Sequence, residues 1–189
     1  MSKERAILDV AMRLFSQYGY KRTSVDDIAL GAGIAKGTIY VYFESKEALF
    51  RALCTTIVER MYAEVERATT GDAPAIIRIE TALRTKFGRL FRMVMSTPHG
   101  REMVESRDAV AADIFKAFDR KFEALLVGII ESGLARNEIS RTDAALNAKS
   151  IAQTLIAASR GLAAAARDVG DFDRRFEALL AVVQTGLRR

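Results

Sequence analysis

The sequence predicts an all-α protein made of a small N-terminal domain, residues 1–48, and a larger helical domain, residues 49–189. The chain has only two prolines in 189 residues, and 50% of its residues are hydrophobic, which is enough for a sizeable packed core. Apolar residues recur at helical spacing along most of the chain, whereas the alternation typical of strands is scarce.

The first helix is predicted from an apolar stripe near the N-terminus. Its members are Ile7, Ala11, Leu14, Phe15 and Tyr18. Gly19 fits a left-handed C-cap, and Tyr20 is the apolar residue that follows such a cap. This helix is expected to share one small core with the two helices that come next.

Residues 23–49, TSVDDIALGAGIAKGTIYVYFESKEAL, predict a helix, a glycine turn, a second short helix and the start of a third. Ser24 or Thr23 can cap the first of these helices, and two aspartates then fall in its first turn, where the helix dipole favours them. Its buried face is expected to hold Val25, Ile28, Ala29 and Ala32. Gly33 suits a tight turn that requires positive φ, so the segment is typical of a helix-turn-helix DNA-binding unit.

The short helix after the turn is predicted from Lys36 to Phe43, with Ile39 and Phe43 facing inward. Its other side would then present a lysine, a hydroxyl and two phenols, groups that reach phosphates and base edges: Lys36, Thr38, Tyr40 and Tyr42. Gly37 allows close approach of the backbone to a ligand. The alternative is that the tyrosines only pack and that Lys36 and Lys46 are ordinary solvated charges.

Six further helices are expected after Ser45, which can cap the first of them. A long helix from about Lys46 to Ala68 could link two domains rigidly. Asp72 and Pro74 are placed at the start of a helix that runs to about Met95. The remaining helices are predicted at 101–106, 112–132 and 143–167, followed by a last helix marked by Phe172, Phe176, Leu179, Leu180 and Val183.

The net charge of +5 fits a nucleic-acid binder but does not locate the site. Residues 1–50 hold seven Lys and Arg against six Asp and Glu, whereas residues 78–107 hold seven against three. The basic excess therefore lies mostly outside the helix-turn-helix segment. A small local cluster can still bind phosphates, because such contacts depend on geometry.

No sequence pattern supports an enzyme. The chain lacks a Gly-rich phosphate loop and a G-x-S-x-G motif, and its single histidine, His99, excludes a multi-histidine zinc site. Cys54 is expected to be a buried small hydrophobe. There is no signal-peptide run and no 18-residue span without charges, so a cytoplasmic protein without a membrane segment, metal or cofactor is expected.

Residues 5–53 resemble the N-terminal domain of the TetR family of transcriptional repressors, through LFSQYGYKRTSVDDIA, AGIAKGTIYVYF and SKEALF. The resemblance implies a dimer whose third helices enter successive major grooves of a double-stranded, palindromic DNA operator. The DNA contacts that it implies are Thr23, Ser24, Lys36, Gly37, Thr38, Tyr40, Tyr42 and Lys46. One position departs from the family pattern, since Ala35 stands where Ser or Thr is common, which removes a cap of about 1 kcal/mol.

A palindrome reader needs two-fold symmetry, and the last two helices, about 143–188, are the expected homodimer interface. They are rich in small residues, which let another helix approach closely and would suit a four-helix interface. The alternative is that both helices only pack against their own domain.

The middle helices are expected to enclose a pocket for an unknown small-molecule effector, as the resemblance implies. Its candidate lining is apolar apart from one histidine: Phe87, Phe91, Met95, His99, Met103, Phe118 and Phe122. Each of these residues could instead be plain core. Arg84, Arg89 and Arg92 could face an anionic effector, or be solvated.

The expected function is repression released by an apolar or aromatic effector, which would bind a conformation with a different spacing of the two recognition helices. A nonspecific DNA-coating protein is the alternative.

Overall fold

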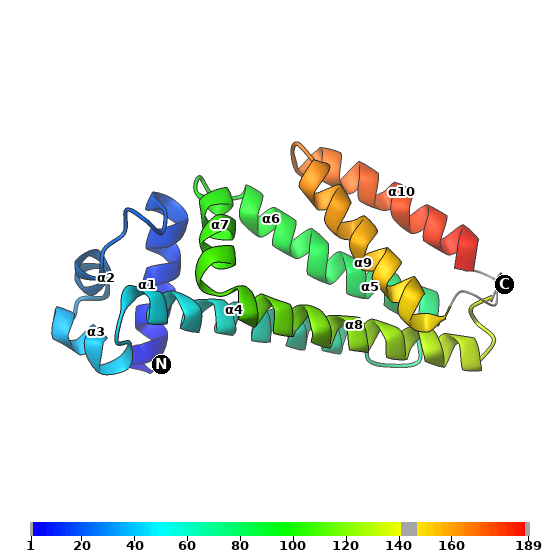
Figure 1. Cartoon of the computed structure of the whole chain (residues 1–189), viewed down its shortest axis with the longest axis horizontal. Helices are drawn as coiled ribbons and strands as arrows, with labels where there is room; N and C mark the ends of the chain where they lie inside the picture. The colour runs from blue at the N-terminus through cyan, green and yellow to red at the C-terminus, as the bar shows by residue number, and fades with distance from the viewer. Residues whose placement is uncertain (1, 141–146, 188–189) are drawn as a thin grey trace. The chain divides into compact units, whose positions relative to one another are not determined.

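The computed structural model describes residues 2–140 and 147–187, and it confirms the all-α fold (Figure 1). The first four helices are α1 (Lys3–Tyr18), α2 (Val25–Ala32), α3 (Lys36–Tyr42) and α4 (Lys46–Thr69). They are followed by α5 (Ala75–Leu83), the π-helical segment η1 (Arg84–Gly88), α6 (Arg89–Met95) and α7 (Gly100–Val110). The last three are α8 (Ala112–Ala135), α9 (Ala148–Ala165) and α10 (Val169–Leu187).

The chain folds into two compact units. The N-terminal unit contains the residues up to Glu59 together with Met93–Lys116, and the C-terminal unit contains Arg60–Arg92 and the chain from Ala117 onward. The domain boundary expected between residues 48 and 49 falls inside α4, which continues without interruption to Thr69. The N-terminal unit therefore includes α7, which is remote in sequence from the first three helices.

The core of the N-terminal unit is built around three aromatic rings. Phe15, Tyr20 and Phe50 lie with ring centroids 4.6–5.7 Å apart. Ile7, Ile28 and the other core side chains around them are almost completely buried. Tyr18, which was expected in the apolar stripe of α1, is 50% exposed. The chain turns at Gly19, and Tyr20 fills the core position instead.

The local signals of the helix-turn-helix segment produce the expected geometry. Ser24 and Asp27 form a capping box at the start of α2, and Gly33 ends that helix with φ +65° and ψ +34°, in the left-handed region. The left-handed C-cap expected at Gly19 is wrong: its φ is positive, +89°, but its ψ of +154° lies outside the left-handed region. Ser45 Oγ accepts from the amide of Ala48 and caps α4.

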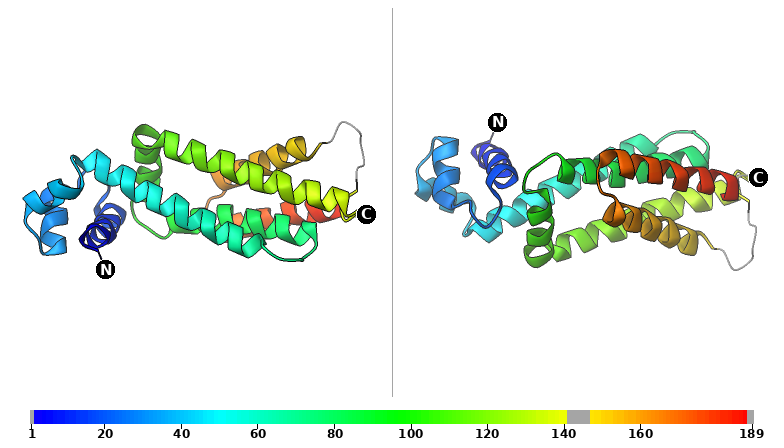
Figure 2. Two further views of the ribbon diagram at one scale, coloured as in Figure 1. Left: turned by 90° about the horizontal axis from the view of Figure 1, so that it is seen from below. Right: turned by 90° about the horizontal axis from the view of Figure 1, so that it is seen from above.

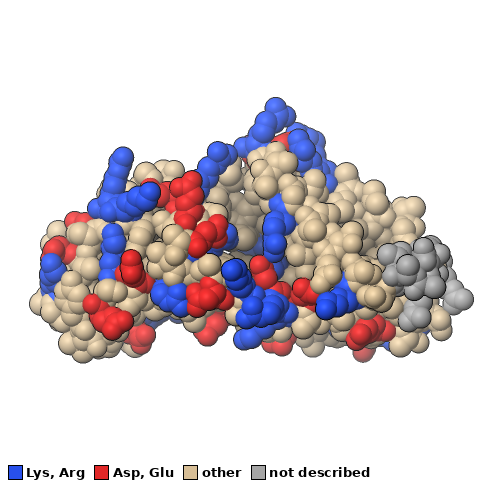
Figure 3. Space-filling view, in the orientation of Figure 1, with Lys and Arg blue, Asp and Glu red and all other residues tan. Residues whose placement is uncertain are grey.

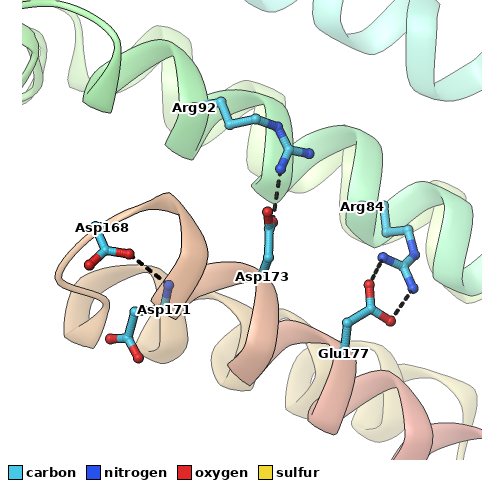
Figure 4. A network of polar contacts seen from close by, with 6 residues as sticks. All are labelled: Arg84, Arg92, Asp168, Asp171, Asp173 and Glu177. Carbon is cyan, nitrogen blue, oxygen red and sulfur yellow. Dashed lines mark hydrogen bonds and ion pairs between the residues drawn. The ribbon is translucent and has the colours of Figure 1, made fainter.

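In the C-terminal unit, α9 and α10 lie side by side, and α10 also packs on α5 (Figures 1 and 2). Phe172 stacks on Phe91 and on Phe176, with centroids 4.5 and 5.1 Å apart. Figure 4 shows how ion pairs from η1 and α6 complete this packing, since Arg84 forms two hydrogen bonds with Glu177 and Arg92 reaches Asp173.

The structure differs from the expected helices in the middle of the chain. The helix expected from Pro74 to Met95 is divided by η1, and Asp72 does not cap it; the amide of Ala75 instead donates to Glu138 Oε2, 2.6 Å away. The tertiary contact replaces the local cap because the carboxylate of Glu138 reaches the helix N-terminus. α7 is longer than expected at both ends. α9 is capped by Asn147, and its expected start at 143 lies outside the described residues.

Candidate nucleic-acid interface

The short helix α3 has one buried face and one exposed face. Ile39 and Phe43 are buried in the core of the N-terminal unit, and burial of a side chain such as Ile39 contributes on the order of 2 kcal/mol. Tyr40 and Tyr42 are 46% and 42% exposed, and Val41 between them is 79% exposed. Val41 lies near the end of α3 outside the core of the N-terminal unit, and it was not among the contacts expected from the sequence.

Lys36, at the start of α3, is held by a carboxylate of α2. Its Nζ lies 2.8 Å from Asp26 Oδ2, and both side chains are at least half exposed. The hydrogen bond with Asp26 raises the pKa of Lys36. Ala35 provides no side-chain cap, so the first amides of α3 lack a side-chain acceptor from the N-cap residue. Thr38 is half-buried on the same helix.

Gly37 has no structural neighbour that would exclude a side chain. A Cβ atom built at this position meets no heavy atom within 4 Å, and φ at Gly37 is not positive. The fold of the described chain therefore does not require glycine here.

Thr23 and Ser24, which precede α2, are both engaged in local hydrogen bonds. Thr23 is 3% exposed, and its hydroxyl donates to the carbonyl of Gly19 at 2.8 Å. Ser24 Oγ accepts from the amide of Asp27 at 3.1 Å and donates to its carboxylate at 2.7 Å. The hydrogen bonds that the Ser24 hydroxyl and the Ser24 amide donate to the carboxylate lower the pKa of Asp27. Of the two hydroxyl residues, only Ser24 is exposed.

Lys46 supports the loop between α1 and α2. Its Nζ donates to the carbonyls of Tyr20 and Thr23 at 3.0 and 3.2 Å and lies 4.5 Å from the centroid of the Tyr20 ring. Lys46 is half-buried. Lys46 therefore holds the loop that leads into α2 in the free protein.

The loop after α1 is also attached to α7. Glu102 Oε1 accepts from the backbone amide of Lys21 at 3.0 Å, and this bond is the main reason that the pKa of Glu102 is lowered. Its other oxygen lies 3.2 Å from His99 Nδ1. A Cβ at Gly19 would lie 2.3 Å from Glu102 Oε2. The loop and α7 thus fit each other closely, and sequence spacing gave no indication of this contact because 81 residues separate its partners.

Two further contacts bind the segment 93–116 to the rest of the N-terminal unit. Arg51 of α4 forms two hydrogen bonds with Asp113, at 2.7 and 2.8 Å, and a third with the carbonyl of Val110. The guanidinium of Arg51 lowers the pKa of Asp113 to about 2. Ser16 of α1 donates to Met103 Sδ at 3.7 Å.

On the face shown in Figure 3, charged side chains of both signs are scattered among uncharged ones, and acidic groups stand among the basic ones.

Comparison with known proteins identifies the N-terminal helices as the DNA-binding domain of a bacterial regulator. Residues 7–53 match the family described as "Bacterial regulatory proteins, tetR family". The chain is 27% identical to the HTH-type transcriptional regulator YhgD of Bacillus subtilis over 150 residues, 78% of each protein. It is 32% identical to the HTH-type transcriptional regulator RutR of Escherichia coli K12 over 141 residues, 70% of this chain and 64% of RutR.

The chain belongs to the TetR family. It is a DNA-binding transcriptional regulator and not an enzyme. A transcriptional regulator from Saccharomonospora viridis, solved in complex with choline, has the same fold with a TM-score of 0.71 at 21% identity, over 98% of this chain and 97% of that one.

The effector-binding candidates of this TetR-family regulator are divided between its two units. Four phenylalanines belong to the C-terminal unit and are 0–8% exposed: Phe87, Phe91, Phe118 and Phe122. Met95, His99 and Met103 belong to the N-terminal unit. His99 lines an open pocket of about 550 Å³ beside α1 and α2, together with Arg13, Tyr18 and Leu30.

The three arginines considered for an anionic effector each have an acidic partner. Arg84 pairs with Glu177, Arg89 with Glu64 and Arg92 with Asp173. All three are exposed. Another cation of the same region, Lys86, is 3% exposed and was not singled out from the sequence.

The described residues were also compared with the requirements of a metal site, a membrane-spanning helix and a reactive thiol. There, no group of three or more His, Cys, Asp and Glu side chains could hold a metal ion. None of the described helices is long and apolar enough to cross a membrane. Cys54 is buried, and burial raises the pKa of its thiol to about 11.

Proposed function

We propose that this regulator is a homodimeric repressor that binds a palindromic operator through α3 and is released when a small apolar or aromatic effector binds the C-terminal unit. One observation supports the DNA contact most directly: α3 buries Ile39 and Phe43 and leaves Lys36, Gly37, Tyr40 and Tyr42 on an exposed surface. Phenols and an ammonium reach phosphates, and open backbone at glycine allows close approach.

Val41 extends this proposed surface. It is the most exposed apolar side chain of α3, and a methyl-bearing side chain in the major groove can contact the C5-methyl group of thymine. Lys46 and the segment Thr23–Ser24 are proposed to support the interface at the entry to α2, where their hydrogen bonds already order the loop.

The homodimer is proposed to form through α9 and α10. Each helix exposes small or apolar residues at helical spacing, namely Thr154, Ala157, Gly161 and Ala164 on α9 and Ala178, Ala181, Val182 and Thr185 on α10. Two copies of this surface could pack as a four-helix interface, because small residues permit close approach of the helices. The proposed range of 143–188 begins and ends outside the described residues.

The proposed route from effector to DNA uses the continuous helices. α4 runs from the N-terminal into the C-terminal unit without a break, and the segment 93–116 is held to the α1–α2 loop by Glu102 and to α4 by Arg51. An effector that favours another conformation of the C-terminal unit would then change the spacing of the recognition helices, within the limit set by its differential affinity.

A footprint on genomic DNA bound by the purified protein tests the proposal. A repressor protects a short palindrome, whereas a nonspecific coating protein protects DNA of every sequence. Tyr42→Phe and Lys46→Ala should each weaken operator binding in gel shifts. Unchanged affinity in both variants would refute the proposed contacts, and protection without sequence preference would refute the function.

A further inference from the structure

Lys86 is a buried cation surrounded by aromatic rings in the interior of the C-terminal unit. Its side chain is 3% exposed, and its Nζ lies 4.2, 4.6 and 5.4 Å from the ring centroids of Phe122, Phe118 and Phe87. Lysine is almost never fully buried unless it is paired. Three of the four phenylalanines expected to line an effector pocket thus surround a positive charge.

The partner that neutralises Lys86 also has a second cation. Asp119 Oδ1 accepts from Lys86 Nζ at 2.7 Å, and Asp119 Oδ2 pairs with the exposed guanidinium of Arg160 at 3.1 Å. The Asp119 side chain is 40% exposed. Asp119 could therefore release Lys86 to another anion without being left unpaired, since Arg160 and water remain available to it.

The ammonium and a neighbouring hydroxyl have unused hydrogen-bonding capacity. An ammonium carries three donors, and within the described residues Lys86 makes one hydrogen bond, the bond to Asp119. Ser159, next to Arg160 on α9, is 0% exposed, and its hydroxyl has no partner in the described part of the protein. α9 packs on η1, the segment that carries Lys86. A buried hydroxyl without a hydrogen-bond partner destabilises the fold unless a ligand or a water supplies that partner.

The backbone around Lys86 is irregular. Lys86 lies in the middle of η1, and π-helical segments are rare and often occur at functional sites. In sequence, Lys86 follows Leu83 by three residues and so falls on the apolar stripe of this helix, where a core would hold a hydrocarbon side chain.

We propose that Lys86 is the anion-binding group of the effector site, so that the effector class is a carboxylate with an apolar or aromatic body. The carboxylate would replace Asp119 as the partner of the ammonium, and its body would lie against Phe118 and Phe122. A quaternary ammonium such as choline would be repelled by Lys86, because the ammonium of Lys86 already lies over the aromatic rings that would bind such a cation. This inference rests on the effector role proposed above and specifies the chemistry of that site.

The test measures binding without DNA, by titration calorimetry at neutral pH. The probes are ω-phenylalkanoic acids of increasing chain length, each with its neutral amide and its primary amine. The acids should bind roughly tenfold more tightly than the amides, because the ion pair forms in a mostly dry site, and the amines should bind most weakly. Equal binding of acids and amides, or no binding of any acid, would overturn the inference.

Two variants assign the preference to Lys86. Lys86→Met keeps the apolar stem and should reduce the affinity of the acid to that of the amide while leaving amide binding unchanged. Asp119→Asn removes the internal competitor and should tighten binding of the acid by roughly threefold or more. A purely structural Lys86–Asp119 pair would instead lower the melting temperature of Asp119→Asn without favouring the acid. Arg174→Gln removes the same charge from an exposed arginine that pairs with Asp171, and it should leave the acid-to-amide ratio unchanged.

The outcome is separable from that of the proposed function. If acids bind through Lys86 but none of them releases the operator, effector-controlled repression fails and the anion site stands. If only neutral or cationic compounds release the operator, repression stands and the anion site fails.

Discussion

At the scale of single residues, the described fold does not require glycine at position 37, because a Cβ there meets no heavy atom within 4 Å. Gly37→Ala should therefore stabilise α3 by about 0.5–1 kcal/mol through helix propensity, measured by urea denaturation. Operator affinity should fall at least about tenfold if DNA backbone approaches Gly37 closely. Gly128→Ala on α8, equally open, should stabilise the fold and leave DNA binding unchanged. Unaltered operator binding by Gly37→Ala would argue against close approach.

In the proposed interface Asp26 would compete with DNA for Lys36, since the two side chains form an exposed ion pair. Asp26→Asn should raise affinity for DNA of any sequence by roughly three- to tenfold at low salt and make it more salt-dependent, because the freed ammonium can displace counterions. Fluorescence anisotropy across a salt series measures both effects. Asp9→Asn removes the same charge from another exposed pair, with Arg5 of α1. An equal gain in that control would mean that only net charge matters.

At the scale of elements, α7 and the α1–α2 loop form a contact that depends on Glu102. Glu102→Ala should destabilise the protein by about 1 kcal/mol and speed hydrogen exchange at the amide of Lys21, which loses its acceptor. Urea denaturation and amide exchange by NMR measure these changes. Glu105→Ala, at an exposed position of the same helix, should change neither.

Gly19 provides the second half of this test. Gly19→Ala should lower the free energy of unfolding more in the wild-type background than in the Glu102→Ala background. In both backgrounds alanine is strained by the φ of +89°, but only in the wild type does its Cβ also clash with Glu102 Oε2. Equal costs in the two backgrounds would show that α7 does not hold the loop.

Sequence patterns predicted the elements whose signals are local. The Ser24 cap, the left-handed Gly33 and the inward pair Ile39 and Phe43 each follow from residues at most four positions apart. What sequence could not supply depends on distant partners. The amide of Ala75 is capped by Glu138, the loop after α1 is held by Glu102, and Lys86 is buried against Asp119. Tyr18 was misplaced because the chain turns at Gly19, and Tyr20 rather than Tyr18 packs on the distant Phe50.

At the scale of the whole molecule, binding a palindrome requires two copies of α3 held by a common interface, so dimerisation and operator affinity should be lost together. Val182 on α10 is 69% exposed in one chain, so Val182→Asp should leave the fold intact and yet disrupt the proposed interface. Multi-angle light scattering at micromolar concentration should find a monomer, and operator affinity should fall roughly a hundredfold or more as the second half-site stops contributing. Ala124→Asp, at an exposed position of α8, should remain dimeric. A dimeric Val182→Asp variant with full operator affinity would place the interface elsewhere.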